Sequence, residues 1–157
     1  MTATATGAPA TAIRDIVVEE VFPHSPETIW RALTSGELIG RWLMAPTGFA
    51  PLPGTRFTFQ TKAGGSWDGV IHCQVLEVVA NERFVYSWKG GHADNVGYGS
   101  PLDTTVTWTL TRTGEGTRVR LVHAGFAVPR NQSALDVMGN GWKTVVPRLG
   151  SVASEQK

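Results

Sequence analysis

The sequence has a single cysteine, Cys73, so the chain cannot form an internal disulfide. This favours a reducing compartment, and we expect a cytoplasmic protein. Charge is also scarce, because 17% of the 157 residues are charged, the formal net charge is +1 and no basic run occurs. We therefore expect no nucleic-acid partner, since binding to a phosphate backbone needs clustered positive charge.

Long apolar runs are absent as well. No stretch approaches the ~20 apolar residues of a membrane-spanning helix, and we expect no membrane association. The N-terminal stretch MTATATGAPATA lacks the basic start and apolar block of a signal peptide. Its small, polar, aperiodic residues predict a disordered tail over 1–12. The length of the chain predicts one domain, which we place over 13–152, and we expect a C-terminal tail over 153–157.

The usual signatures of metal and nucleophile sites are missing. His72 and Cys73 are adjacent in a predicted strand and point to opposite faces, and neither forms a zinc-ligand spacing with His92 or His123. Nothing in the sequence supplies Cys73 with a base and an orienting group. The stretch GGHADNVGYG follows a strand without opening a helix, unlike a phosphate-binding loop. We predict no metal and no other cofactor.

Alternating apolar and polar residues predict strands over most of the chain. The predicted strands are 13–22, 55–61, 67–80, 83–88, 104–112 and the segment after the turn at 113–116. The segment 67–80 is long enough to need a bend or bulge, which we expect near Gly69. In 104–112 we expect Val106, Trp108 and Leu110 to face inward and the threonines to face outward. The segment 89–103 has no periodicity and predicts a mobile or functional loop.

Three helices are expected. Ser25 can cap a short helix that has Pro26 in its first turn, and a second short helix is predicted over 36–43. A longer helix is predicted to begin near Asn131, with Pro147 kinking or shortening it. Its single apolar stripe consists of Leu135, Met138, Trp142, Val145 and Leu149.

This order of elements predicts an α+β fold. Strands joined by short turns give a curved antiparallel sheet, and two short helices follow its first strand. The last helix is the one predicted element long enough to cover the apolar face of the sheet. A twisted sheet that curls around a helix leaves a space between them, where a ligand can bind.

Several stretches carry a resemblance to a known family: SPETIWRALTSGELIGRWL, PGTRFTF, VLEVVANERFVYSW, TTVTWTLT and GTRVRLVHAGF, then GW and Leu149. From about residue 13 to 152 the chain resembles the helix-grip domains of the START/Bet v 1-like (SRPBCC) superfamily. Within it, the chain is similar to the branch of the C-terminal domain of the Hsp90 ATPase activator (AHSA1-like). The resemblance implies a curved sheet that grips the C-terminal helix around an apolar cavity.

Members of the superfamily include lipid and hormone carriers, polyketide aromatase/cyclases and co-chaperones. We favour binding of a hydrophobic or aromatic small molecule in the cavity over catalysis. An aromatase/cyclase-type enzyme and a chaperone-associated or stress-response domain remain alternatives. An exposed sheet edge permits a monomer or a homodimer. The predicted cavity residues are Trp42, Phe57, Phe59, Tyr86, Trp88, Trp108, Leu121, His123, Met138 and Trp142.

His123 is the one candidate for catalysis. Alternation places it on the inner face with Val119 and Leu121, while Arg118 and Arg120 face outward. Burial lowers the pKa of a histidine, so a neutral ring is expected at pH 7. Two interpretations stay open, a core histidine that is bonded within the protein, or a polar anchor or general base for a ligand. The resemblance favours the first, because a histidine before GF is part of the family's sequence pattern. An enzyme would use His123 with Tyr86 or Asp94.

Overall fold

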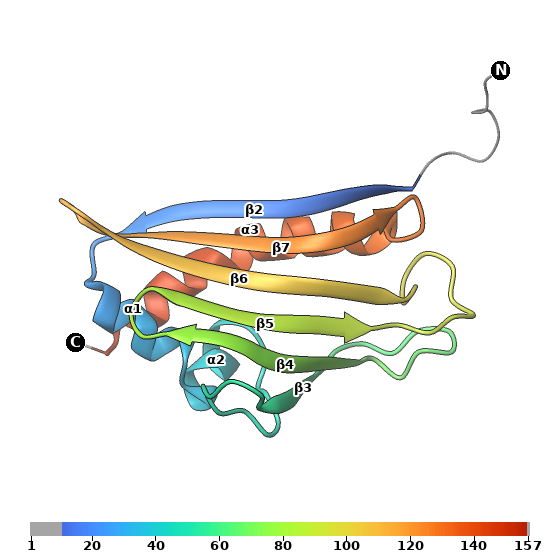
Figure 1. Ribbon diagram of the computed structural model, residues 1–157, viewed down its shortest axis with the longest axis horizontal. Helices are drawn as coiled ribbons and strands as arrows, with labels where there is room; N and C mark the ends of the chain where they lie inside the picture. The colour runs from blue at the N-terminus through green and yellow to red at the C-terminus, as the bar shows by residue number, and fades with distance from the viewer. Residues whose placement is uncertain (1–10, 157) are drawn as a thin grey trace, which may run out of the picture.

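The structure, a computed structural model, describes residues 11–156 (Figure 1). In this range the strands form one antiparallel sheet in the order β2-β7-β6-β5-β4-β3. The strands are β2 (Ala12–Phe22), β3 (Arg56–Gln60), β4 (Val70–Val79), β5 (Arg83–Gly90), β6 (Leu102–Thr113) and β7 (Gly116–Val128). The helices are α1 (Pro26–Leu33), α2 (Gly36–Trp42) and α3 (Gln132–Ser154). The predicted α+β helix-grip fold is confirmed.

Figure 1 shows how the helices sit against the sheet. Helix α3 runs along one face of the sheet behind β2 and β7, and α1 and α2 lie at one end of the same face. The connection from β5 to β6 lies at the opposite end. Of the predicted N-terminal tail, residues 1–10 lie outside the described residues, and β2 begins at Ala12. Helix α3 extends to Ser154, into the segment expected as a C-terminal tail.

Strand alternation sorts the side chains of the sheet as expected. Val119, Leu121 and His123 of β7 are fully buried, while Arg118 and Arg120 of the same strand are exposed. The reason is geometric, because successive side chains of a pleated strand point to opposite faces. The inward face of the sheet therefore becomes the core that α3 covers.

The bulge of strand β4 is not at Gly69. The register between β4 and β5 shifts between Val75 and Glu77, which places the irregularity at Leu76, a half-exposed residue. Gly69 instead precedes the strand with a φ of 82°. A Cβ at this position would collide with the carbonyl oxygen of Thr61, so the glycine permits a close approach of backbone to backbone.

Helix α3 also departs from expectation, because it continues through Pro147 to Ser154. Pro147 lacks an N–H and leaves the carbonyl of Lys143, one turn earlier, without its helical partner. Both residues are exposed, so water can replace the lost hydrogen bond. On the opposite side Trp142, Val146 and Leu149 are buried and hold the helix against the sheet.

The N-terminal helices form where their caps predict. The Ser25 side chain accepts a hydrogen bond of 3.2 Å from the Thr28 amide, and Pro26 occupies the first turn of α1. Ser35 caps α2 in the same way, through the amide of Leu38. None of the helices within residues 11–156 is long and apolar enough to cross a membrane.

Candidate functional site

A pocket of about 270 Å³ opens between α3, the start of β4, the end of β5, and the loops that adjoin these strands at the end of the sheet away from α1. The wall is mainly apolar, with three tryptophans and two methionines. Its lining residues are Leu43, Met44, Thr61, Trp67, Ile71, Trp88, Gly91, Tyr98, Gly99, Ser100, Leu102, Ala134, Val137, Met138, Gly141, Trp142 and Val145. Aspartate, glutamate, lysine, arginine and histidine are all missing from this set.

Helix α3 supplies one wall of the pocket through a stripe of small and flexible residues. Ala134, Met138, Gly141 and Val145 are spaced at i, i+4, i+7 and i+11, so they lie on one face of the helix. A Cβ built on Gly141 meets nothing within 4 Å, so this glycine contributes open space. The stripe shapes the pocket on the helix side without filling it.

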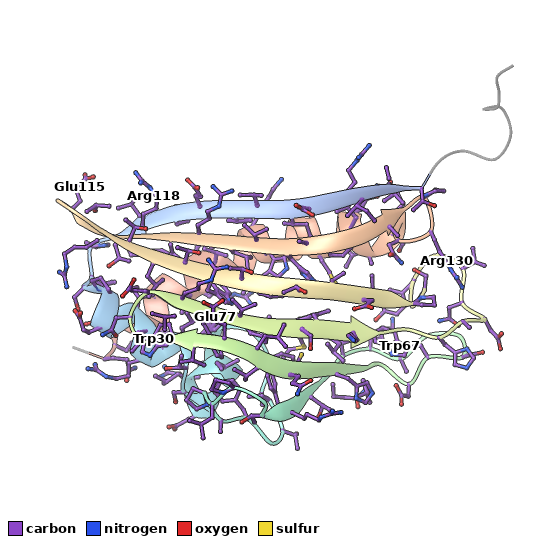
Figure 2. The ribbon with its side chains drawn as sticks, in the orientation of Figure 1. Trp30, Trp67, Glu77, Glu115, Arg118 and Arg130 are labelled. Atoms are coloured by element: carbon purple, nitrogen blue, oxygen red, sulfur yellow. The ribbon has the colours of Figure 1, made fainter. Side chains whose placement is uncertain are left out.

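Two segments, which we call the mouth loops, supply the opposite rim: 61–69 and 91–101. Thr61 and Trp67 come from the first, and Tyr98 and Ser100 come from the second. Both loops lie at the end of the sheet away from α1, and Figure 2 shows Trp67 and Trp30 at opposite ends of the molecule. The long loop that the sequence predicted as mobile or functional therefore borders the pocket.

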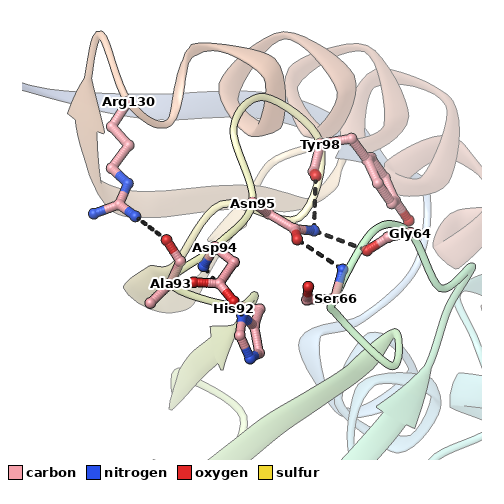
Figure 3. A network of polar contacts seen from close by, with 8 residues as sticks. All are labelled: Gly64, Ser66, His92, Ala93, Asp94, Asn95, Tyr98 and Arg130. Atoms are coloured by element: carbon pink, nitrogen blue, oxygen red, sulfur yellow. Dashed lines mark hydrogen bonds and ion pairs between the residues drawn. The ribbon is translucent and has the colours of Figure 1, made fainter.

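Asn95 joins the mouth loops to each other (Figure 3). Its Oδ1 accepts a hydrogen bond of 2.8 Å from the Ser66 amide. Its Nδ2 donates to the carbonyl oxygens of Gly64 at 2.8 Å and Tyr98 at 3.2 Å. Gly99 makes room for this amide, because a Cβ there would collide with Nδ2 of Asn95. Asn95 is buried and has every amide hydrogen-bonding group engaged on the two loops.

The far side of loop 91–101 is fixed to the start of α3. Arg130 donates to the carbonyl oxygen of Ala93 at 2.8 Å, and the Ser100 hydroxyl donates to the carbonyl oxygen of Arg130 at 3.1 Å. Asn131 donates to the carbonyl oxygen of Pro101 at 2.8 Å. The loop is thus anchored to α3 at its base and held to loop 61–69 at its tip.

His123 lies in the core and not in the wall of the pocket. It has no solvent-exposed surface, and both of its ring nitrogens are within hydrogen-bond distance of protein groups. Trp142 Nε1 donates to Nδ1 at 3.0 Å. The other nitrogen, Nε2, is 2.8 Å from the hydroxyl of Thr104.

These partners fix one neutral tautomer of His123. Because Nδ1 accepts from Trp142, Nε2 carries the hydrogen and donates to Thr104, whose hydroxyl donates to the carbonyl oxygen of Trp88 at 2.7 Å. Burial lowers the pKa of His123 from 6.5 to about 3, so the ring is neutral at pH 7. This geometry is that of the core histidine, the first of the two interpretations.

Thr104 corrects one sequence expectation, that the threonines of β6 face outward. Thr104 is buried because it has the same strand parity as Val106, Trp108 and Leu110. Its hydroxyl is the acceptor that a buried, neutral His123 requires. The alternation of the strand, which puts Thr104 on the same face as Val106, could have identified it as buried.

The other predicted cavity residues divide between pocket and core. Trp88, Met138 and Trp142 line the pocket. A second group is buried and is not part of the lining: Trp42, Phe57, Phe59, Tyr86, Trp108, Leu121 and His123. A run of edge-to-face rings connects the two groups, from Trp42 through Trp108 and Trp142 to Trp88, with centroid separations of 5.5, 5.8 and 5.8 Å.

The remaining reactive groups are masked by burial. Burial raises the pKa of the Cys73 thiol and of the Tyr86 phenol far above neutrality. The Tyr86 hydroxyl also accepts a hydrogen bond of 3.1 Å from Trp108 Nε1.

Asp94 lies on loop 91–101, near His92, and is not among the residues that line the pocket. Residues 11–156 contain no group of three or more His, Cys, Asp or Glu side chains able to hold a metal ion.

Comparison with known proteins identifies the family. Residues 23–154 match the family described as Activator of Hsp90 ATPase homolog 1-like protein. The chain belongs to this AHSA1-like family. The crystal structure of protein MLL2253 from Mesorhizobium loti is similar over 92% of this chain and 99% of that chain, with 35% identity and a TM-score of 0.79. The resemblance noted in the sequence is thereby confirmed.

More distant structures share the fold. CalU16 from Micromonospora echinospora has 24% identity and a TM-score of 0.68 over 96% of this chain and 88% of that chain. The Aha1 dimer from Colwellia psychrerythraea has 18% identity and a TM-score of 0.69 over 89% of this chain and 96% of that chain. No curated protein matches the chain. The function therefore has to be argued from the site itself.

Sequence reasoning missed the part of the pocket built by the mouth loops. Tyr98 and Ser100 belong to a segment without regular periodicity, so no face could be assigned to them. Trp67 was predicted as the first residue of strand 67–80, but β4 begins at Val70 and Trp67 lies in the loop before it. Asn95 gave no signal either, since its partners are the backbones of residues 29 and 31 positions away along the chain. Too many strand residues were predicted to line the cavity, because a side chain on the inner face of the sheet can also be packed in the core.

Proposed function

We propose that this AHSA1-like domain binds a hydrophobic small molecule in the pocket between α3, the sheet and the mouth loops. The observation that carries the proposal is the pocket itself, about 270 Å³ of space with a wall of apolar side chains and no charged ones. Concave, largely apolar sites with a few polar groups are typical of small-molecule binding. Filling the pocket removes apolar surface from water, which is favourable.

Binding is favoured over catalysis by the chemistry of the wall. General acid–base catalysis needs a titratable side chain within hydrogen-bond reach of the reacting group. Tyr98 is the one titratable side chain among the lining residues, and its hydroxyl donates to the carbonyl oxygen of Lys62. His123 is buried behind Trp88 and Trp142, with both ring nitrogens engaged.

The proposal is tested by filling the pocket from α3. We expect Gly141→Leu to place its side chain into the open space on the pocket stripe and to weaken binding of the neutral fluorophore N-phenyl-1-naphthylamine by about tenfold or more. Binding is measured as the rise in fluorescence on titration into the protein. Leucine is the better helix former by ~0.8 kcal/mol, so the variant should remain folded.

Gly139→Leu is the matched control. Gly139 is also a helical glycine of α3 whose Cβ would meet nothing within 4 Å, but it is not part of the pocket lining. We expect Gly139→Leu to bind the fluorophore as the wild type does. Absence of binding to the wild type, or equal binding by the wild type and Gly141→Leu, would contradict the proposed function.

A further inference from the structure

The three tryptophans of the pocket wall differ in what their indole N–H groups do. Trp142 Nε1 donates to His123 at 3.0 Å, and Trp67 Nε1 donates to the carbonyl oxygen of Val70 at 3.1 Å. Trp88 Nε1 is buried and has no hydrogen-bond partner among the described residues. A buried donor without an acceptor costs about 1–3 kcal/mol. Trp88 is therefore a lining residue whose indole N–H is buried and makes no hydrogen bond in the described structure.

The hydroxyl groups of the wall are mostly committed to the protein. Tyr98 donates to the carbonyl oxygen of Lys62, and Ser100 donates to the carbonyl oxygen of Arg130 while it accepts from Asn131. Their donor hydrogens are therefore already used. Among the indole N–H groups of the three lining tryptophans, that of Trp88 alone makes no hydrogen bond in the described structure.

The wall of the pocket contains several polar side chains but no charged one. The lining residues carry no ionisable side chain except Tyr98. At the mouth, the Arg130 guanidinium donates to the carbonyl oxygen of Ala93, and neither Arg130 nor Lys62 of loop 61–69 is among the lining residues. Burying an isolated carboxylate without a partner is far more costly than burying a neutral polar group. The pocket offers an anion no compensation for its lost water.

Resting on the proposed function, we infer that the occupant is a neutral molecule of mainly apolar surface with a hydrogen-bond acceptor that receives the N–H of Trp88. A ketone, ether or ester oxygen meets this requirement, whereas a fatty acid or another carboxylate does not. Trp88 Nε1 is buried by neighbouring atoms that form no hydrogen bond with it. The acceptor of the ligand therefore displaces these atoms when it binds. The gain is the hydrogen bond that the free protein lacks.

Three naphthalenes of nearly the same outline test the inference through displacement of N-phenyl-1-naphthylamine. They are 2-ethylnaphthalene, which has no acceptor, 2-acetylnaphthalene, which has a neutral acceptor, and 2-naphthoate, which has a charged one. We expect the ketone to displace the fluorophore at a concentration about tenfold or more below that of the carboxylate. Equal or better displacement by 2-naphthoate overturns the neutral-ligand assignment and leaves the proposed function standing. If the fluorophore itself does not bind, the proposed function fails, and this inference fails with it.

Trp88→Phe tests the acceptor. The variant keeps an aromatic ring but lacks the N–H, so we expect the ketone to lose about fivefold more affinity than 2-ethylnaphthalene. Trp67→Phe is the matched control, because its indole lines the same pocket but already donates to Val70. It should weaken both probes by similar factors. Equal losses of the two probes in Trp88→Phe overturn the role of this N–H.

A second measurement needs no variant of the buried Trp88. The indole proton resonance of Trp88 in the wild type should move downfield with 2-acetylnaphthalene and much less with 2-ethylnaphthalene, since a hydrogen bond forms with the ketone alone. Similar shifts with both probes contradict the assignment even if Trp88→Phe does not fold.

Discussion

At the scale of single residues, His123 shows how a polar side chain is accommodated in an apolar core. The ring lies between an indole donor on α3 and a hydroxyl on β6, so each of its nitrogens has the partner that the neutral form requires. Protonation would place a hydrogen on Nδ1, where Trp142 already donates one. The contacts of His123 therefore stabilise the fold in a protonation-dependent way.

This arrangement predicts a stability that falls with acidification. In the folded state the pKa of His123 is lowered to about 3, whereas the unfolded chain takes up the proton near 6.5. The unfolded state thus binds one more proton between these values, and the free energy of unfolding falls by about 1.4 kcal/mol per pH unit from this group. Above pH 6.5 both states are neutral at this site, and its contribution is constant.

His123→Gln isolates the effect. The variant should be less stable at pH 7 by about 1–3 kcal/mol, because buried partners lose hydrogen bonds. Its free energy of unfolding, from denaturant titrations at several pH values, should depend less steeply on pH than that of the wild type. The carboxylates are shared by both proteins and cancel in the difference. Parallel pH profiles of the two proteins would contradict this role.

At the scale of elements, the mouth loops lie outside the helices and strands of the fold and border the pocket. Loop 91–101 is anchored to α3 through Asn131 and Arg130, and its tip meets loop 61–69 through Asn95 and Tyr98. Opening the rim therefore requires the tip contacts to break, while the anchors at the base can persist. If the pocket binds a ligand as proposed, we expect the ligand to enter along the seam between the two loops.

Asn95→Ala tests the seam. Removing the amide leaves the Ser66 amide and the Gly64 carbonyl without their partner, at a cost of about 1–3 kcal/mol. We expect faster hydrogen exchange at the Ser66 amide, and faster association and dissociation of N-phenyl-1-naphthylamine in stopped-flow fluorescence. Ser66→Ala is the control, because it preserves the backbone donor. Unchanged rates in Asn95→Ala would place the entrance elsewhere.

The contrast between strands and loops also explains what could be predicted from the sequence. Val119 and Leu121 were assigned to the core correctly because strand geometry relates neighbouring residues by a fixed rule. Thr104 follows the same rule and was misplaced by its polarity. The contacts of Asn95 could not be inferred, because they join loops whose relative positions depend on the whole fold.

At the scale of the whole molecule, the packed and the open parts of the interior are separated along the sheet. Trp30, on α1, packs against Phe84 near one end, and Trp67 lies at the other end with the mouth loops (Figure 2). The rings of Trp42 and Trp108 fill the interior between α2 and the sheet. A helix-grip fold of this size thus combines a solid aromatic core with a pocket at one end of α3.

The six tryptophans allow the central claim to be measured directly. Three of them line the pocket, Trp67, Trp88 and Trp142, and three do not, Trp30, Trp42 and Trp108. The decisive measurement is a nitrogen–proton correlation spectrum of the indole groups during titration with N-phenyl-1-naphthylamine. We expect the resonances of the first three to show the largest, saturable shifts. No saturable shift, or the largest shifts at Trp30 and Trp42, would contradict binding in this pocket.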